Sequence, residues 1–473
     1  MLDWLLEVNA QVNAVVWGPP MLILLVGAGV YITVRTRAVQ FRKFGLMCRE
    51  TMGKIVHRGP RGEGDVTPFQ ALTVAMGGTV GVGNIAGVAT AIALGGPGAI
   101  FWMLVSGLLG MATKFAEVVL GMHYRRREPG GPMVGGPMLY IERGLGRRWR
   151  WLAVLFAAFG ALAAFGIGNM VQSNAVAGGL EDFLGVPRWA TGVGLILAVG
   201  LVTIGGIRRI AQVAMVCVPF MCALYLLGAV VVVVLYAGRI PDVVSLVVAR
   251  AFTPTAATGG FAGAAVLMTI RFGIARGVFS NEAGLGSAPM AHATARTDHP
   301  VRQGLWGIFE VFVDTIVMCS LTAAVILLTG VWDGGESGEA LTMTAFAEPF
   351  GRNLGFGLVV LCMILTAYDT NLAWCFYGET CTAYLFGHGH VTRRAYRLLW
   401  LPFTLLGALG QLEAIWSISD TLNGLMAVPN LVALIVLAGV VVRLTRGFLA
   451  GRSYESPRDG SGAMPHGLPD ARP

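Results

Sequence analysis

Apolar runs long enough to cross a lipid bilayer follow one another along almost the whole chain. A spanning helix takes about 20 mainly apolar residues, and runs near that length lie at 15–34, 66–94, 97–122, 151–180, 189–207, 210–237, 258–291, 303–330, 354–386, 396–411 and 414–445. Backbone groups inside a bilayer have no water to pair with, so spans of this kind form helices. The sequence therefore predicts an all-α polytopic membrane protein with about 11 transmembrane helices.

Composition supports this class and argues against others. Hydrophobic residues make up 55% of the 473 residues and charged residues 13%, whereas soluble domains carry about 25% charged residues. A net charge of +8 would suggest nucleic acid in a soluble protein. Arginines in cytoplasmic loops explain it here, so no nucleic-acid partner is expected. The seven cysteines form no CxxC pair and the histidines lie in or beside loops, so no transition-metal site is predicted.

Basic residues gather in alternate loops, and this pattern predicts the topology. Loops 35–64 and 123–150 are rich in arginine, whereas the loops around Glu181 and Asp333 are acidic or mixed. Arginine and lysine favour the cytoplasmic side. We therefore expect a multi-pass protein of the plasma (inner) membrane with its N-terminus outside and its C-terminus in the cytoplasm, which an odd number of spans allows.

Two of the apolar runs are interrupted by glycines near their middle. The first contains GGTVGVGNIAGVATAI at 77–92, and the second contains GIARGVFSNEAGLGSAP at 273–289. Glycine weakens a helix interior, and two interrupted spans in corresponding positions of two halves indicate a transporter's binding site. The alternative is that these glycines only allow close helix packing.

The topology gives the two interrupted runs opposite directions, and five spans begin with each of them. The sequence thus predicts an inverted repeat of five plus five helices. We expect an extra N-terminal helix and basic cytoplasmic loop at 1–65, a first repeat at 66–240, a second at 241–446, and a disordered cytoplasmic tail at 447–473.

An interrupted helix exposes peptide groups that can bind a ligand. Freed N–H groups suit a carboxylate and freed carbonyls suit a cation. The expected gap at 79–84 would bind a substrate carboxylate and a coupling ion, and the expected gap at 272–280 would offer carbonyls to an ammonium group. A small zwitterion fits both.

Polar side chains lie at the same depth. Asn169, Gln172 and Asn174 are in run 151–180, with helix–helix hydrogen bonding as the plainer interpretation. Asp369 is the most telling residue, because a carboxylate in mid-span is costly. It could join a cation site, carry a proton, or pair with Arg271 or Arg276.

Other acidic residues have simpler interpretations. Asp314 and Glu310 could also neutralise those arginines, and Lys114 with Glu117 suggests a structural or gating pair. The chain has no HExxH motif and no filter-like repeat, so we expect neither an enzyme nor a channel.

Several motifs resemble the alanine/glycine:cation symporter family, also called sodium:alanine symporters. They are TPFQALTVAMGGTVGVGNIAGVATAIALGGPGAIFW, GVFSNEAGLGSAP, HPVRQGLWGIFEVFVDT and the run from Trp374 to Glu379. The resemblance covers about 15–446. It implies a LeuT-type five-plus-five fold with two discontinuous helices and alternating access. It also implies uptake of alanine or glycine coupled to Na⁺, or in some cases to H⁺, with no other cofactor.

The resemblance also implies site residues. Those implied for the substrate are Thr79, Gly81, Gly83, Phe165, Gln172, Asn174, Phe272, Gly273, Gly277, Thr370 and Trp374. For the cation, the first gap and the mid-span carboxylate together predict Gly78, Val80, Asn84, Asp369 and Thr370. The indole of Trp374 would close a small side-chain pocket. The oligomeric state and the choice among alanine, glycine, serine and D-alanine stay open.

One departure from the family pattern concerns the coupling ion. Family members usually read Ser-Thr-Ile-Leu-Gly-Trp where this chain reads Asp369-Thr370-Asn371-Leu372-Ala373-Trp374. The aspartate adds a charge beside the expected ion site. Our hypothesis is that Asp369 either tightens sodium binding or lets a proton replace sodium.

Overall fold

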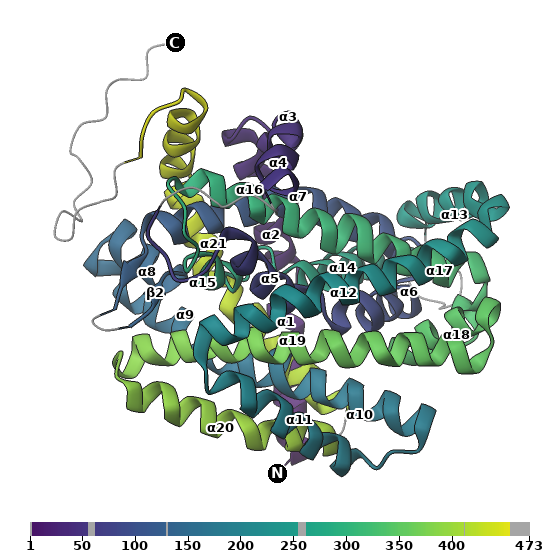
Figure 1. Cartoon of the computed structure of the whole chain (residues 1–473). Helices are drawn as coiled ribbons and strands as arrows, with labels where there is room; N and C mark the ends of the chain where they lie inside the picture. The colour runs from purple at the N-terminus through teal and green to yellow at the C-terminus, as the bar shows by residue number, and fades with distance from the viewer. Residues whose placement is uncertain (1, 55–61, 129–130, 254–261, 411, 455–473) are drawn as a thin grey trace.

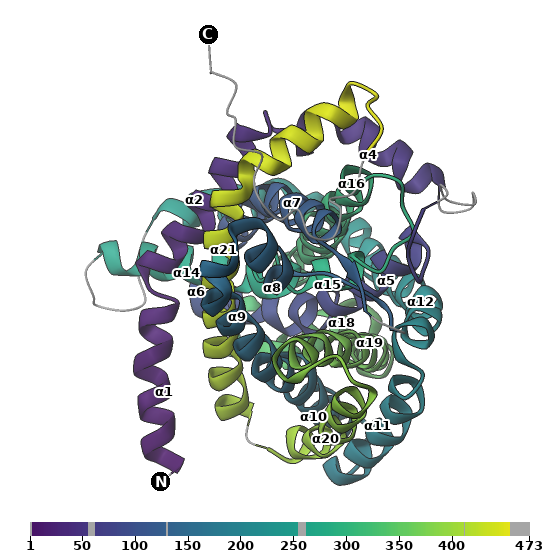
Figure 2. The ribbon, with the colours of Figure 1, turned by 90° about the vertical axis from the view of Figure 1, so that its left-hand side faces the viewer.

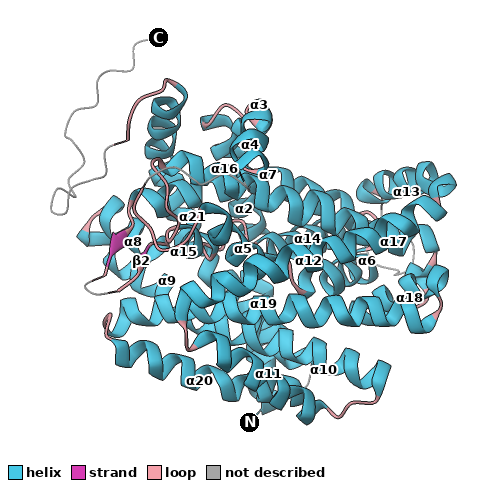
Figure 3. Ribbon diagram, in the orientation of Figure 1, coloured by secondary structure: helices cyan, strands magenta, loops and turns pink. Residues whose placement is uncertain are grey.

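A computed structural model describes residues 2–54, 62–128, 131–253, 262–410 and 412–454. Helices make up nearly all the regular structure of this part of the chain (Figures 1 and 3). A single two-stranded antiparallel sheet within it pairs β1 (Arg126–Arg127) with β2 (Met133–Val134). The prediction of an all-α protein is confirmed.

The bounds of the helices are as follows. The α-helices are α1 (Leu2–Val16), α2 (Pro19–Arg35), α3 (Val39–Arg42), α4 (Phe44–Glu50), α5 (Pro68–Thr79), α6 (Val88–Gly95), α7 (Ala99–His123), α8 (Pro137–Tyr140), α9 (Arg150–Ala163), α10 (Val171–Leu184), α11 (Arg188–Thr203), α12 (Gly206–Leu235), α13 (Ile240–Phe252), α14 (Ala262–Asn281), α15 (Ala288–His292), α16 (Pro300–Val311), α17 (Ser320–Thr329), α18 (Gly338–Phe350), α19 (Arg352–Phe386), α20 (His390–Leu409) and α21 (Leu412–Leu449). Wider π-helical turns at Gly83–Gly87, Ile141–Leu145, Ala164–Met170 and Phe312–Cys319 adjoin α-helices, and short 3₁₀ turns lie at Met52–Lys54, Arg147–Trp149, Ala237–Arg239 and Val331–Asp333.

Each predicted apolar run falls on a helix or on an interrupted pair of helices. Within the described residues, six helices are long and apolar enough to cross a membrane, and two bent pairs bring the number to eight. Three predicted runs correspond to helices that are not both long and apolar enough by this test. Run 189–207 corresponds to α11, run 258–291 to α14 with α15, and run 396–411 to α20. Pro429 lies inside α21 and does not divide it.

The N-terminal helices pack along the last helix. In Figures 1 and 2, α1, α2 and α21 run side by side and across the direction of α19. The side chain of Asn9 in α1 donates to Ser417 in α21 at 2.7 Å, and that of Asn13 donates to Thr421 at 3.0 Å. The bonded residues advance in the same direction along α1 and α21. The amide of Asn13 also reaches the carbonyl of Ser417 at 3.4 Å. Thus α1 and α2 run parallel to α21.

The first interruption lies where the sequence predicts it. Thr67 and Gln70 form a reciprocal capping box at the start of α5, which fixes where that helix begins. The helix ends at Thr79, Val80 leaves the helical conformation with ψ 87, and helical structure resumes at Gly83. The two parts are bent by 49°. Gly81 lies within the break and Gly83 at its end, and glycine stabilises helix interiors poorly.

The second interruption lies further along the chain than predicted. Helix α14 is continuous through Phe272 and ends at Asn281, and the break covers 282–287. Glu282, Gly284 and Gly286 have φ values of +54, +97 and +82. The Asn281 side chain accepts the N–H of Ala283 at 2.9 Å, a local bond that competes with helix continuation.

The predicted gap at 272–280 is therefore wrong, and helix packing explains its glycines. A Cβ atom on Gly273 would lie 2.3 Å from the carbonyl oxygen of Ala99, and one on Gly277 would lie 2.3 Å from the hydroxyl of Ser106. Both positions face α7 at distances that only glycine allows. The packing alternative left open by the sequence applies to Gly273 and Gly277.

Candidate functional site

The two interrupted helices meet at the first break. A Cβ atom on Gly83 would lie 3.2 Å from the Cα of Ser280, near the end of α14, and 3.3 Å from the ring of Phe279. This glycine therefore allows close approach of the two backbones. Phe279 and Ser280 were not among the predicted site residues, although both belong to the GVFSNEAG motif.

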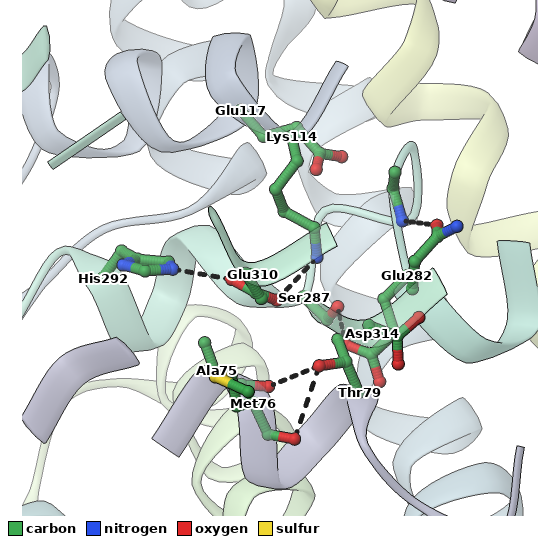
Figure 4. A network of polar contacts seen from close by, with 12 residues as sticks. Ala75, Met76, Thr79, Lys114, Glu117, Glu282, Ser287, His292, Glu310 and Asp314 are labelled. Atoms are coloured by element: carbon green, nitrogen blue, oxygen red, sulfur yellow. Dashed lines mark hydrogen bonds and ion pairs between the residues drawn. The ribbon is translucent and has the colours of Figure 1, made fainter. Parts of the chain in front are cut away.

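The first break is held by side chains that reach back to its backbone. The N–H of Gly81 donates to Oδ1 of Asn84 at 2.9 Å, and the N–H of Val82 donates to Oε1 of Gln172 at 3.5 Å. The Thr79 hydroxyl bonds to the carbonyls of Ala75 and Met76 at 3.3 and 3.4 Å, within its own helix (Figure 4). The predicted residues Thr79, Gly81 and Gln172 thus lie at the break.

Hydroxyl and amide groups surround the carboxylate of Asp314 beside the first break, and we call this group the oxygen cluster. Its carboxylate accepts bonds from Asn84 at 2.7 Å, from Ser280 at 3.0 and 3.1 Å, and from Thr315 at 2.8 Å. All four side chains are buried. They come from the first break, the end of α14 and the π-helical turn Phe312–Cys319.

This oxygen cluster suits a hard cation. The carboxylate and the two hydroxyls offer oxygen ligands of the kind that hard cations accept. The Asn84 amide turns its nitrogen toward Asp314 and its oxygen toward the N–H of Gly81. The sequence predicts Asn84 in a cation site and Asp314 as a counter-charge for arginines. The structure instead places Asp314 beside Asn84, a pairing that the EVFVDT motif alone does not indicate.

A second polar group lies where α5 contacts α19. The Thr370 hydroxyl donates to the carbonyl of Gly77 at 2.8 Å. A Cβ atom on Gly77 would lie 3.2 Å from the Cβ of Asp369, and one on Gly78 would lie 3.2 Å from the Tyr377 ring. Asp369 and Thr370 thus border the glycines just before the break.

Asp369 has no arginine partner in the described structure. Neither carboxylate oxygen has a nitrogen or oxygen hydrogen-bond partner among these residues, and the Cys217 thiol faces the carboxylate. Arg276 pairs with Asp420 at 3.0 Å. The interpretation of Asp369 as a counter-charge for Arg276 is therefore wrong, which leaves the cation-site and proton-carrier alternatives.

Trp374 connects α19 to the second break. Its indole Nε1 donates to Oε1 of Glu282 at 2.8 Å, and the Ser287 hydroxyl donates to Oε2 of the same residue. A Cβ atom on Gly168 would lie 2.0 Å from the Cβ of Trp374. The Trp374 side chain is fully buried.

Glu117 of α7 holds the backbone of the second break. Its Oε1 accepts the N–H groups of Gly284 and Gly286, each at 3.0 Å, and the amide of Asn430 at 2.6 Å. Asn430 also donates to the carbonyl of Gly284 at 2.8 Å. A side chain from another helix thus replaces the missing intrahelical bonds.

Lys114 pairs with Glu310 and not chiefly with Glu117. Its ammonium lies 3.1 Å from Oε1 of Glu310, whose Oε2 lies 2.8 Å from Nε2 of His292 (Figure 4). All three side chains are buried. The network ties α7 to α15 and α16.

Three predicted substrate residues lie elsewhere. The Asn174 amide donates to the carbonyls of Gly407 and Gly410 at 2.8 and 2.9 Å, at the end of α20. Phe165 packs on the ring of Phe403 with centroids 4.5 Å apart. The Cβ of Phe272 faces Gly95 in α6. The structure therefore does not bring these side chains to the breaks, and Asn174 follows the helix–helix alternative.

The comparisons with known proteins agree with this architecture. A family model described as the sodium:alanine symporter family matches residues 2–459. The chain belongs to the sodium:alanine symporter family.

Relatives of this family and one solved structure extend the assignment. The chain is 42% identical to the sodium/alanine symporter AgcS of Methanococcus maripaludis, over 96% of this chain and 99% of that one. It is 37% identical to the probable sodium/glutamine symporter GlnT of Bacillus subtilis, over 91% of this chain and 87% of that one. Among solved structures it resembles MhsT in complex with L-phenylalanine, with a TM-score of 0.56 at 12% identity, covering 82% of this chain and 99% of that one.

These findings fix the class of the protein. Membership in the sodium:alanine symporter family makes the chain a cation-coupled amino-acid transporter and not an enzyme, and it supports Na⁺ as the coupling ion. The structural likeness shows the LeuT-type fold. The predicted family and fold are thereby confirmed.

Proposed function

We propose that the protein carries a small neutral amino acid, alanine or glycine, into the cell together with Na⁺ by alternating access. The observation that carries the proposal is the meeting of two interrupted helices at Gly83 and Ser280, beside the oxygen cluster of Asp314. The peptide groups of the first break thereby lie next to the end of α14 and a candidate cation site.

The substrate lies between the two breaks in this proposal. The N–H groups of Gly81 and Val82, which donate to Asn84 and Gln172 in this structure, exchange these acceptors for the substrate carboxylate. The carbonyls of the break at 282–287 receive the ammonium group, replacing the gap at 272–280 inferred from the sequence. The buried indole of Trp374 closes the side-chain pocket in this proposal, which favours a methyl-sized side chain. The 42% identity to a protein named sodium/alanine symporter supports this choice.

Two places can receive the cation. One is the Asp314 cluster with Asn84, Ser280 and Thr315. The other is the group of Thr370, Asp369 and the carbonyls of the preceding glycines, with the Gly78 and Val80 carbonyls as further acceptors. Each combines a carboxylate with neutral oxygens, an arrangement that suits Na⁺ as cargo.

We also propose that the N-terminus is outside and the C-terminus is in the cytoplasm, with repeats at 66–240 and 241–446. Helices α2 and α21 run parallel, and arginines from the end of both line one cavity. Such a basic cluster belongs on the cytoplasmic side by the positive-inside rule.

Counterflow in proteoliposomes tests the function. Vesicles loaded with unlabelled alanine should accumulate labelled alanine and glycine in the presence of Na⁺, and should fail to do so when choline replaces Na⁺. Glutamine serves as the competing larger substrate, because GlnT is named for it. Exchange of glutamine in preference to alanine would contradict the proposed substrate, and exchange that is equal without Na⁺ would contradict the coupling.

A further inference from the structure

A basic cavity lies where α2, α3 and α21 end together. Its lining includes Arg35, Arg37, Arg42, Lys43 and Arg446, and it encloses about 180 Å³. An adjoining cavity of about 390 Å³ shares Arg35 and Arg446 and adds Arg443 and Arg452. Neither lining contains an acidic side chain. We call the two together the basic pocket.

The cationic side chains of the basic pocket have no acidic partner in the part of the chain that the structure describes. Arg37, Arg42, Arg443 and Arg446 are exposed, and Arg35 contacts the ring and hydroxyl of Tyr31 instead of a carboxylate. Other arginines differ: Arg302 pairs with Asp298 and Glu50, and Arg393 pairs with Glu128 and Glu379. The basic pocket therefore carries several like charges whose repulsion a bound anion would relieve.

The backbone is bent sharply to build this site. Arg37 and Ala38 have φ values of +56 and +52, a conformation that residues with a Cβ atom rarely adopt. This turn follows the end of α2 directly and starts α3, so that Arg42 and Arg35 line the same cavity. The chain adopts an unfavourable turn at the position where the charges gather.

The surroundings favour a lipid over a free anion. Buried Val39 and Val442 line the cavity beneath the charges. Exposed apolar side chains continue along the same two helices, with Val34 of α2 68% exposed and Val436 of α21 54% exposed. Both helices belong to candidate membrane spans. Basic pockets between spanning helices at the membrane surface are typical sites for anionic headgroups.

We propose that the basic pocket binds the phosphate-containing headgroup of an anionic phospholipid, with its acyl chains along the exposed apolar sides of α2 and α21. The bound lipid would connect the N-terminal helix pair to the last helix at the membrane surface. This site is separate from the two helix breaks, so it does not depend on the substrate or the coupling ion.

Native mass spectrometry of the purified full chain tests the proposal. Wild type is compared with the triple variant R37Q/R42Q/R446Q and with the matched control R147Q/R148Q/R394Q, which removes the same charge from exposed arginines elsewhere. Each is mixed with phosphatidylglycerol or with phosphatidylcholine of the same acyl chains. We expect wild type and control to retain phosphatidylglycerol at least ten-fold better than the R37Q/R42Q/R446Q variant, and all three to retain phosphatidylcholine equally.

Two further arms distinguish the alternatives. The charge-conserving variant R37K/R42K/R446K should keep most of the lipid binding, and loss equal to that of the glutamine variant would show a purely structural role. Inorganic phosphate alone should not raise the melting temperature as phosphatidylglycerol does. Equal stabilisation by phosphate, or equal lipid retention in the R37Q/R42Q/R446Q variant and the control, would overturn the proposal.

Discussion

The indole Nε1 of Trp374 donates a hydrogen bond to Oε1 of Glu282 at 2.8 Å, and this contact joins α19 to the break in the second interrupted helix. Glu282 has φ +54, a conformation that non-glycine residues rarely take. The Ser287 hydroxyl donates to its other carboxylate oxygen. The break is therefore stabilised both from within and from α19.

Replacing Trp374 with phenylalanine tests this connection. We expect Trp374→Phe to destabilise the protein by about 1–3 kcal/mol, because a buried carboxylate oxygen loses its donor, and to raise KM for the amino acid. Thermal unfolding and uptake kinetics measure the two effects. Trp332→Phe, a partly exposed tryptophan away from both breaks, is the control. An unchanged melting temperature and KM in Trp374→Phe would show that the bond is not needed.

The oxygen cluster around Asp314 predicts an effect on sodium. Asp314→Asn should weaken the apparent Na⁺ affinity by at least about ten-fold, equivalent to about 1.4 kcal/mol, because the only full negative charge of that cluster is removed. The sodium dependence of alanine uptake in proteoliposomes is the measurement. The exposed Asp333→Asn carries the same change of charge and should behave as wild type. If both variants bind Na⁺ alike, Asp314 does not hold the cation.

His299 predicts a dependence of stability on pH. Burial, with the Arg302 charge adding to it and Asp298 opposing it, lowers the pKa of His299 from 6.5 to about 4. Its neutral Nδ1 accepts the N–H of Val301 at 3.1 Å at the start of α16. Because the folded pKa is below the unfolded one, this contribution is present above pH 6.5 and is lost as the pH falls toward 4. One pKa unit corresponds to about 1.36 kcal/mol, so the loss is at most about 3 kcal/mol and is reduced by solvent screening.

The variant His299→Asn isolates that contribution, because asparagine can cap the helix without titrating. Unfolding of both proteins is followed between pH 4 and 8. The difference in stability between wild type and His299→Asn should shrink or reverse below pH 6.5. A difference that is constant across the range would contradict the role assigned to His299.

The position of the first break was predicted correctly from the sequence, and that of the second was not. One physical ambiguity explains the difference. A glycine in an apolar helix marks either a backbone that leaves the helix or a neighbour that leaves no room for a side chain. At Gly81 the backbone leaves the helix. At Gly273 and Gly277 the helix continues, and the glycines are needed because α7 lies against them. Only the position of α7 separates the two cases, and that position is not encoded within the segment itself.

The oxygen cluster shows the same limit. Asn84 and Asp314 are separated by 230 residues, and the carboxylate reaches the first break from a π-helical turn. A motif can indicate that Asp314 is functional, yet its partner follows from tertiary packing. Polar residues inside a span are ambiguous in the same way: Gln172 faces the break, whereas Asn174, two residues later, bonds to α20.

Removing the Glu117 carboxylate should destabilise the backbone of the second break. Glu117→Leu should destabilise the protein by several kcal/mol, because two buried N–H groups and one amide each lose an acceptor at about 1–3 kcal/mol. Glu117→Gln keeps an acceptor oxygen at the same place and should cost less. Thermal unfolding of the two variants gives the comparison. Equal stability of both variants would mean that Glu117 is not what holds the backbone of Gly284 and Gly286.

Asp369 predicts which ion drives transport. A buried carboxylate without a nitrogen or oxygen donor is costly unless a cation or a proton neutralises it. Gly77, just before the first break, lies against Asp369. Asp369→Ser, which introduces the serine expected from the family resemblance, should therefore change the ion dependence of uptake. We expect either an apparent Na⁺ affinity lower by about ten-fold, or loss of the uptake that an inward proton gradient drives without Na⁺. Uptake by wild type and variant is measured across separate sodium and pH gradients, with Asp369→Asn as the variant of equal size. If Asp369→Ser matches wild type under both gradients, the carboxylate takes no part in coupling.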